Sequence, residues 1–352
     1  MARLRRADCS GPGISRRGRG RGFEYLDEDG ERIADDEVLD RIRELAIPPA
    51  WRDVWICPYP MGHLQATGTD DAGRKQYLYH QRWRERRDQE KFDDMIDFAR
   101  ALPRVRARVA KHLRRRSMSR ERVLACAVRL LDRGFFRIGS EGYAEDNGTY
   151  GLATMRKDHV TLEPDGRLTF DYPAKGGARR IQAVVDPDVR KVVEELKRRR
   201  GGGEELLAYK DGRRWRDVRS DDINAYLRDV AGHDCSAKDF RTWSATLLAA
   251  VGVAVSAEAA SGSKTGRRRA IKRAIDEVAR YLGNTPAVCR ASYIDPRVFD
   301  RFNSGWTIAP VLGEVGDLSD PSVRETVEEA VLDLLEDERG SDAIDKGLDV
   351  AA

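Results

Sequence analysis

The spacing of apolar residues changes near residue 80, and this change is the strongest constraint on the fold. Before that point short segments alternate apolar and polar residues, as strands do, around turns at residues 29–30 and 70–73. One amphipathic helix interrupts them; it begins at Asp35 and Asp36 and ends before Pro48. The expected strands lie within residues 23–34, 53–57, 63–67 and 75–80.

Beyond residue 80 the spacing is mostly helical. A highly charged helix is expected to end at Pro103, and Ser119 is expected to cap a second helix that closes at Gly134. Alternation returns at residues 154–185, which predicts two or three strands, and helices follow at 187–200, 220–231, 237–255 and 265–281. The predicted fold class is therefore α+β. A small N-terminal β-sheet domain precedes a mostly α-helical domain with a small β-hairpin or sheet insertion.

Composition divides the chain into five parts. The first 22 residues mix Arg, Gly and Ser without periodicity, which is typical of a flexible basic arm, and the last forty are acidic. The sheet domain, a charged helical connector and the helical domain lie between these two ends. The expected boundaries are 1–22, 23–82, 83–102, 103–312 and 313–352.

Charge is unevenly distributed along the chain. The formal net charge is +4, but residues 313–352 contain 13 acidic and three basic residues, which leaves +14 for the rest. Of the 64 basic residues 52 are Arg, whose planar guanidinium pairs with two phosphate oxygens at once. This balance favours a polyanionic partner such as nucleic acid. A bias towards Arg on an ordinary solvated surface is the alternative that charge alone leaves open.

Several classes of protein are excluded. The longest apolar run has nine residues, too few to span a membrane, and the Arg-rich N-terminus is not a secretory signal. Five cysteines without a C-x-x-C pair argue against a disulfide framework and indicate a reducing cytosol. The five histidines lack metal-ligand spacing, and no Walker A or G-x-S-x-G motif is present.

Four segments concentrate Arg, Lys and Tyr between glycines: Phe136–Leu152, Phe170–Gly177, Ala237–Trp243 and Leu282–Ile294. In this order they resemble the catalytic core of type IB DNA topoisomerases of the bacterial and poxvirus-like branch. Gly62–Tyr77 resembles the first domain of that branch, and the whole resemblance covers residues 13–302. It implies relaxation of supercoiled duplex DNA by transient single-strand cleavage through a 3′-phosphotyrosyl intermediate. It also implies that no cofactor, neither ATP nor a metal ion, is needed.

The resemblance assigns six catalytic residues. Transesterification of a phosphodiester needs a nucleophile, positive charge on the non-bridging oxygens and a proton for the leaving oxygen. Tyr293 matches the nucleophile, and its hydroxyl, with an ordinary pKa of about 10, needs nearby positive charge. The other five are the two phosphate-clamping arginines Arg137 and Arg241, the general acid Lys175, the assisting Lys238, and Asn284 as a hydrogen-bond donor. Most eukaryotic and poxvirus members carry His where this chain has Asn284.

DNA contacts follow from the same resemblance. Gln76, Tyr77 and Tyr79 match residues that face the major groove in the poxvirus enzymes, and Tyr143 matches a further contact. Ser140 stands where those enzymes have Lys, so their cleavage preference is not expected here. The two tyrosines at 77 and 79 could instead lie on a buried strand face. The implied partner is double-stranded DNA, which a monomer would clamp, in the cytoplasm at the nucleoid.

Two other functions fit part of the pattern. Tyrosine recombinases share the Arg, Lys, Arg, Tyr chemistry, but they usually carry His-x-x-Arg where this chain has Lys238-x-x-Arg241. A non-catalytic DNA-binding protein would need only the basic surface. The acidic segment at 321–338 carries an apolar helical stripe, for which a solvated helix is the favoured interpretation and partial docking the alternative. We hypothesise that this segment competes with DNA for the basic body.

Overall fold

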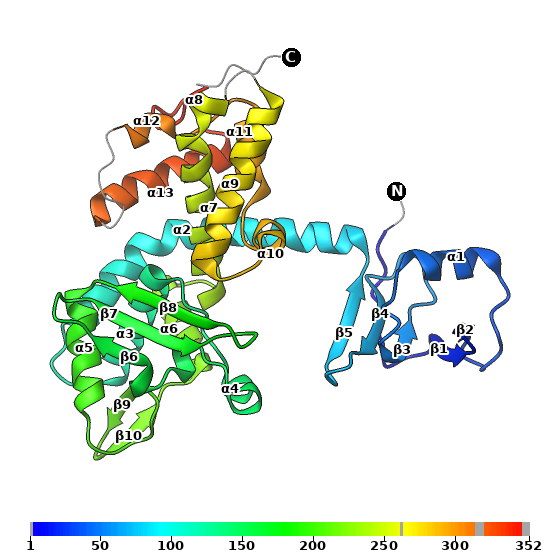
Figure 1. Cartoon of the computed structure of the whole chain (residues 1–352), viewed down its shortest axis with the longest axis horizontal. Coiled ribbons are helices and arrows are strands. Elements are labelled where there is room, and N and C mark those ends of the chain that lie inside the picture. The colour runs from blue at the N-terminus through cyan, green and yellow to red at the C-terminus, as the bar shows by residue number, and fades with distance from the viewer. Residues whose placement is uncertain (1–2, 261–262, 314–319, 347–352) are drawn as a thin grey trace. The chain divides into compact units, whose positions relative to one another are not determined.

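The computed structural model describes residues 3–260, 263–313 and 320–346 (Figure 1). The chain divides into two compact units, Met1–Lys91 and Phe92–Ala352. Small antiparallel sheets and many helices confirm the predicted α+β class. No helix within the described residues is both long and apolar enough to cross a membrane.

The first unit is built on a five-stranded antiparallel sheet in the order β2-β1-β3-β4-β5. Helix α1 (Asp36–Glu44) begins where expected, because the Asp35 carboxylate accepts hydrogen bonds from two backbone N–H groups of its first turn. Its Ile42 packs with Val54 and Ile56 of the sheet in a small core. The strands are β1 (Ile14–Arg19), β2 (Gly22–Leu26), β3 (Arg52–Ile56), β4 (Leu64–Thr69) and β5 (Lys75–Tyr79).

Strand β1 lies inside the segment expected to be a flexible arm. It pairs with β2 and, through Ile14 and Ser15, with β3, so β2 is not joined to residues 31–34 as a regular hairpin. Only an isolated bridge between Leu26 and Arg32 remains there. Backbone pairing and the burial of Ile14, which is 5% exposed, order a segment whose composition is that of a coil.

Helix α2 (Gln81–Leu113) runs through Pro103, so the expected end of the helix at this residue is wrong. Proline removes one backbone donor but does not prevent a helix from continuing when packing compensates for the loss. Buried apolar residues lie on both sides of it, among them Phe98, Leu102 and Val105.

The second unit has one large hydrophobic core. Helix α3 (Arg120–Gly134) is capped by Ser119 as predicted, but its left-handed C-cap is Phe135 rather than Gly134. The alternating segment forms the predicted sheet, β6 (Val160–Leu162), β7 (Leu168–Pro173) and β8 (Arg179–Val184). The four expected helices are α5 (Pro187–Arg198), α6 (Ser220–Ala231), α7 (Ala237–Val255) and α9 (Lys264–Leu282).

The remaining elements of this unit are short or were not expected. A hairpin of β9 (Ala208–Asp211) and β10 (Arg214–Asp217) follows the glycines at 201–203. The short helices are α4 (Glu141–Asn147), α8 (Ala257–Ala260), α10 (Pro286–Ser292), α11 (Pro296–Asn303) and α12 (Ala309–Leu312). Two 3-10 turns are η1 (Leu152–Thr154) and η2 (Lys157–His159).

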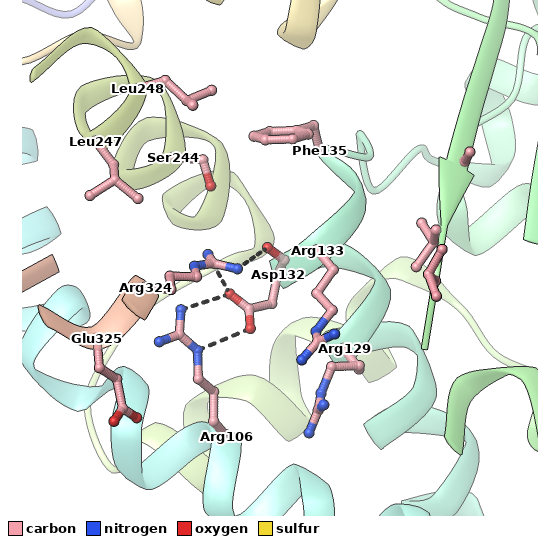
Figure 2. Close-up of a pocket in the computed structure, with 13 residues that line it drawn as sticks. Arg106, Arg129, Asp132, Arg133, Phe135, Ser244, Leu247, Leu248, Arg324 and Glu325 are labelled. Carbon is pink, nitrogen blue, oxygen red and sulfur yellow. Dashed lines mark hydrogen bonds and ion pairs between the residues drawn. The ribbon is translucent and has the colours of Figure 1, made fainter. Parts of the chain in front are cut away.

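Helix α13 (Pro321–Glu336) packs on the second unit, so the expectation of a solvated acidic helix is wrong. Its apolar stripe is buried, with Val327 and Val331 fully inaccessible to solvent. Arg324 of α13 and Arg106 of α2 both donate to Asp132 of α3 beside a cavity of about 510 Å³ (Figure 2). This buried ion cluster ties the acidic C-terminal segment to the helical core.

Candidate active site

Arg137 lies on a loop whose shape is set by two glycines. The chain leaves α3 through the left-handed Phe135, and Gly139, at a φ of +77°, then packs against Gly151. A Cβ on Gly139 would stand 2.8 Å from the Gly151 Cα, so only glycine fits. The Leu152 N–H donates to the Arg137 carbonyl at 2.8 Å, which fixes the backbone that carries this guanidinium.

The C-terminus of α9 gathers three guanidinium groups. Arg241 donates to the Leu282 carbonyl at 2.9 Å, and Arg137 donates to the Gly283 carbonyl at 3.0 Å. Arg180 of β8 donates to the carbonyls of residues 280 and 281. The last carbonyls of a helix lack partners inside it and carry partial negative charge, so they attract cations from three distant segments.

Arg180 was not among the residues singled out from the sequence. Gly283, the left-handed cap of α9, makes room for it, since a Cβ there would collide with the Arg180 guanidinium. Burial lowers the pKa of Arg180. The Tyr172 hydroxyl has the opposite effect on that pKa, but burial is the larger of the two. Its neighbour Arg179 pairs instead with Asp171, and nothing in the sequence distinguishes the two.

Arg241 is the most buried of the three, at 4% exposed. Besides its bond to α9 it donates to the Phe135 carbonyl at 2.5 Å, so it joins the end of α3 to the end of α9. Burial and the nearby Arg137 charge lower the pKa of Arg241 to about 10, which keeps it a cation at neutral pH. Its Nε is buried and has no hydrogen-bond partner among the described residues.

Tyr293 caps the C-terminus of α10 and faces Arg241. The guanidinium carbon of Arg241 lies 5.2 Å from the centre of the phenol ring. Burial raises the pKa of Tyr293, but the charge and hydrogen bond of Arg241, with the charges of Arg137 and Lys238, outweigh it and lower the pKa. The arrangement therefore eases ionisation of the hydroxyl to the phenolate, which is the nucleophilic form.

Asn284 follows the cap of α9 and contacts Arg137. Its Oδ1 accepts a hydrogen bond from Arg137 Nη2. Its Nδ2 is buried without a hydrogen-bond partner of its own, and the polar group it interacts with is the thiol of Cys289, a weak acceptor. Within the described part of the chain, Asn284 Nδ2 and Arg241 Nε are thus two buried donors of one site that lack a regular hydrogen bond.

The two lysines are placed differently. Lys238 is exposed on α7, one helical turn before Arg241, and its charge reaches Tyr293. Lys175 is exposed on the turn between β7 and β8, where Gly176 and Gly177 both have positive φ. No hydrogen bond or ion pair joins its side chain to other described residues. The structure therefore brings together Arg137, Arg241, Asn284 and Tyr293, with Lys238 near enough for its charge to act on Tyr293, but not Lys175.

The predicted DNA contacts in the first unit lie on β5. Tyr77 and Tyr79 are 46% and 39% exposed with their rings stacked 6.2 Å apart, so the alternative that they face a buried core is wrong. Gln76 donates to the Asp70 carboxylate at 2.9 Å. Tyr143 belongs to α4, but its side chain lies outside the described residues.

The site has the donors of an anion site rather than the ligands of a metal site. No group of three or more His, Cys, Asp or Glu side chains that could hold a metal ion occurs in the described ranges. The groups that converge are guanidiniums, an amide and a phenol. Such a set can neutralise a tetrahedral anion and present a nucleophile to it.

Two models of known protein families match this chain. The family model described as the catalytic core of eukaryotic DNA topoisomerase I matches residues 80–304, and that of the bacterial DNA topoisomerase IB N-terminal domain matches residues 22–70. The chain belongs to the type IB DNA topoisomerase family. The resemblance found in the sequence is thereby confirmed.

Individual topoisomerases match to different extents. DNA topoisomerase 1B of Acanthamoeba polyphaga mimivirus is 30% identical over 292 residues, which cover 80% of this chain and 85% of that protein. DNA topoisomerase 1 of Candidozyma auris is 29% identical over 161 residues, 45% of this chain and 20% of that protein. DNA topoisomerase 1B of Vaccinia virus (strain Copenhagen) is 23% identical over 135 residues, 37% of this chain and 43% of that protein.

Proposed function

We propose that the protein relaxes supercoiled duplex DNA by cutting and resealing one strand through a 3′-phosphotyrosyl intermediate on Tyr293. The observation that carries this proposal is the pair of buried donors without a regular hydrogen bond, Arg241 Nε and Asn284 Nδ2, beside a phenol of lowered pKa. Buried donors normally have partners, so two orphans in one site indicate an anion that binds there. A phosphodiester supplies the oxygens that they require.

In the proposed cleavage step, residues of the chain supply both the nucleophile and the proton for the leaving group. The Tyr293 hydroxyl loses its proton to solvent and its oxygen attacks phosphorus, while the bond from phosphorus to the 5′ oxygen breaks. Lys175 gives a proton to that leaving oxygen. Religation runs the same steps backwards. One phosphodiester is exchanged for another of similar energy, so the step needs no ATP.

Arg137 and Arg241 are proposed to bind the non-bridging oxygens. A guanidinium has five N–H donors, and their bonds to the α9 carbonyls and Phe135 use only some of them. The carbonyls hold the guanidiniums in position before DNA arrives, so that little reorganisation is needed when phosphate binds. These cations supply the charge that a metal ion would otherwise provide, and we therefore propose a metal-independent reaction.

Lys175 and Asn284 complete the proposed site. Lys175 lies on an exposed turn with two glycines of positive φ, and we assign its role to the DNA-bound state, in which the turn meets the cleaved strand. Asn284 donates from Nδ2 to a phosphate oxygen but, unlike His, it never becomes a cation. Lys238 assists by its charge on Tyr293.

The wider expectations remain part of the proposal. Gln76, Tyr77, Tyr79 and Tyr143 would contact the duplex, and the protein would act as a monomer that closes around DNA at the nucleoid in the cytoplasm. The exposed, stacked pair on β5 supports contact by the first unit, because exposed aromatic residues suit packing on bases and sugars. This role is independent of the chemistry in the second unit.

Relaxation of a supercoiled plasmid in EDTA without ATP tests the proposal. A type IB enzyme should relax a plasmid of any sequence to completion under these conditions. A tyrosine recombinase would require its specific sites, and a DNA-binding protein without catalysis would leave the linking number of the purified plasmid unchanged. Absence of relaxation by folded protein that binds the plasmid would contradict the proposed function.

A further inference from the structure

A second strongly basic site lies between α9 and α10. Helices α9 and α10 and the end of α11 line a pocket of about 840 Å³, which we call the α9–α10 pocket. Neither Tyr293 nor any other residue of the candidate active site lines it. Its cationic lining residues are Lys264, Arg267, Arg268, Lys272 and Arg290.

Arg267 is the buried cation of this pocket. The residue is only 4% exposed, yet its Nη1 is buried and has no hydrogen-bond partner among the described residues. Burying a guanidinium without a partner is costly, and proteins normally compensate such a charge. A cation held in this way at the wall of a basic pocket indicates an anionic ligand.

The charges around Arg267 do not provide that compensation. The pocket has one acidic lining residue, Asp276, and its carboxylate lies 3.6 Å from Lys272 Nζ. Arg290 stacks over the Phe299 ring, 5.9 Å from its centre. Four of the five lining cations are therefore left without a carboxylate from the pocket.

The cations follow one stripe of α9. Lys264, Arg267 and Arg268, and Lys272 are three to four residues apart, the spacing that places side chains on one helix face. From Lys264 to Lys272 this stripe extends about 12 Å along the helix axis. A single strand of DNA presents a phosphate about every 3.4 Å of helix axis, so the stripe is long enough for several phosphates and the pocket can seat one of them.

We propose that the α9–α10 pocket binds a phosphate group, with the Arg267 guanidinium as its buried donor. The phosphate comes either from a DNA strand or from free phosphate in solution, and the DNA source rests on the proposed function. Pro286, Ala287 and Arg290 of α10 also line the pocket, and Tyr293 caps that helix. A phosphate bound here holds α10 against α9 and so fixes the segment that ends in Tyr293.

The chain offers a matched pair of charge changes for the test. Arg268→Ala with Lys272→Ala removes two exposed cations of the pocket, and Arg269→Ala with Arg273→Ala removes two exposed cations of α9 that do not line it. Arg267→Met removes the buried charge with little change in volume. Since it deletes an uncompensated charge, its thermal midpoint without phosphate should equal or exceed that of the wild type.

The first arm uses inorganic phosphate as the probe, with the full-length protein and chloride at matched ionic strength. Phosphate at about ten times its dissociation constant should raise the thermal midpoint of the wild type by about 3–6 °C. The Arg269/Arg273 control should show the same rise. Arg267→Met and the Arg268/Lys272 variant should lose at least half of it.

The second arm measures DNA affinity against salt in the Tyr293→Phe background, so that cleavage does not contribute. Each lost phosphate contact lowers the slope of log affinity against log salt by about 0.9. A smaller slope for the Arg268/Lys272 variant but not for the control shows that the phosphate is that of DNA. Equal slopes combined with a lost phosphate shift show that the pocket takes free phosphate.

Two results would overturn the phosphate site. One is a wild-type midpoint that phosphate does not raise beyond the chloride reference. The other is an equal rise in the wild type, both pocket variants and the control. Neither arm depends on catalysis, so a failure here is distinguishable from a failure of plasmid relaxation.

Discussion

Neutralising Glu328 should destabilise the second unit by an amount that the ion cluster around α13 allows us to work out. The carboxylate is 6% exposed and accepts hydrogen bonds from Arg106 at 2.6 and 2.8 Å, from Arg324 at 2.9 Å and from Trp243 Nε1 at 3.3 Å. Glu328→Gln keeps the shape but removes the charge. Arg106 and Arg324, whose side chains are both only 18% exposed, would then share only Asp132.

Removing one partner from a buried ion pair costs about 3–5 kcal/mol. Because Asp132 remains in place, we expect the lower end, about 3 kcal/mol. For a unit of this size each kcal/mol lowers the thermal midpoint by about 2–4 °C, so the midpoint should fall by about 6–12 °C. Glu329→Gln is the matched control, because it makes the same change on the exposed face of the same helix.

Acid titration tests the same ion cluster through Asp132, because protonating this carboxylate should destabilise the fold. Burial raises the pKa of Asp132, but Arg324 and Arg106 outweigh it and lower the pKa to about 2 from an ordinary 3.8. A depressed carboxylate pKa stabilises the fold above the unfolded value, and that contribution is lost as pH falls from about 4 to 2. Equal melting of Glu328→Gln and Glu329→Gln at neutral pH would refute the docked helix.

Three further tests by substitution examine the roles assigned in the active site. Lys175→Ala should be rescued by sulfur at the 5′ bridging position, since a thiolate leaves without a proton, whereas Arg241→Ala should not; equal rescue would contradict the division of roles. Asn284→Ala should slow cleavage in single-turnover assays by about 10²- to 10³-fold, the usual effect of losing one oxyanion donor, and a wild-type rate would reduce the residue to a turn former. Arg180→Ala should slow the same step while Arg179→Ala, which only loses its pair with Asp171, should not; identical rates would remove Arg180 from the site.

Local signals in the sequence were sufficient for much of the fold. Asp35 and Ser119 cap the helices that they were expected to cap, and the turn at residues 164–166 separates two paired strands. The ordered motifs were sufficient for the family. These features depend on neighbouring residues and on residue types, which a sequence displays directly.

The structural predictions were wrong where contacts with residues far away in the sequence determine the structure. β1 is ordered by β2 and β3, α2 continues through Pro103 because the residues around it are buried, and α13 is held by Arg106 and Asp132, about 200 residues earlier in the chain. None of these partners is visible from local composition. Long-range pairing can outweigh the local preference of a segment.

In the candidate site, too, local motifs identified some residues, whereas distant contacts determine others. Arg137, Arg241 and Tyr293 were found by motif, but Arg180 was missed because its importance comes from the end of α9, about 100 residues later. Lys175 was found by motif, yet its exposed side chain makes no hydrogen bond or ion pair with the others in the described structure. A motif identifies a residue, whereas only the fold shows what it contacts before DNA binds.

The site and polarity of the covalent DNA linkage decide whether Tyr293 is the nucleophile. The protein is incubated with a duplex whose cleaved strand releases a short 5′-hydroxyl fragment, and the adduct is digested and its peptides are sequenced by mass spectrometry. We predict a nucleotide linked through its 3′ phosphate to Tyr293, and no adduct with a Tyr293→Phe variant that still binds the duplex. An adduct on another residue, a 5′ linkage, or an undiminished adduct with Tyr293→Phe would contradict it.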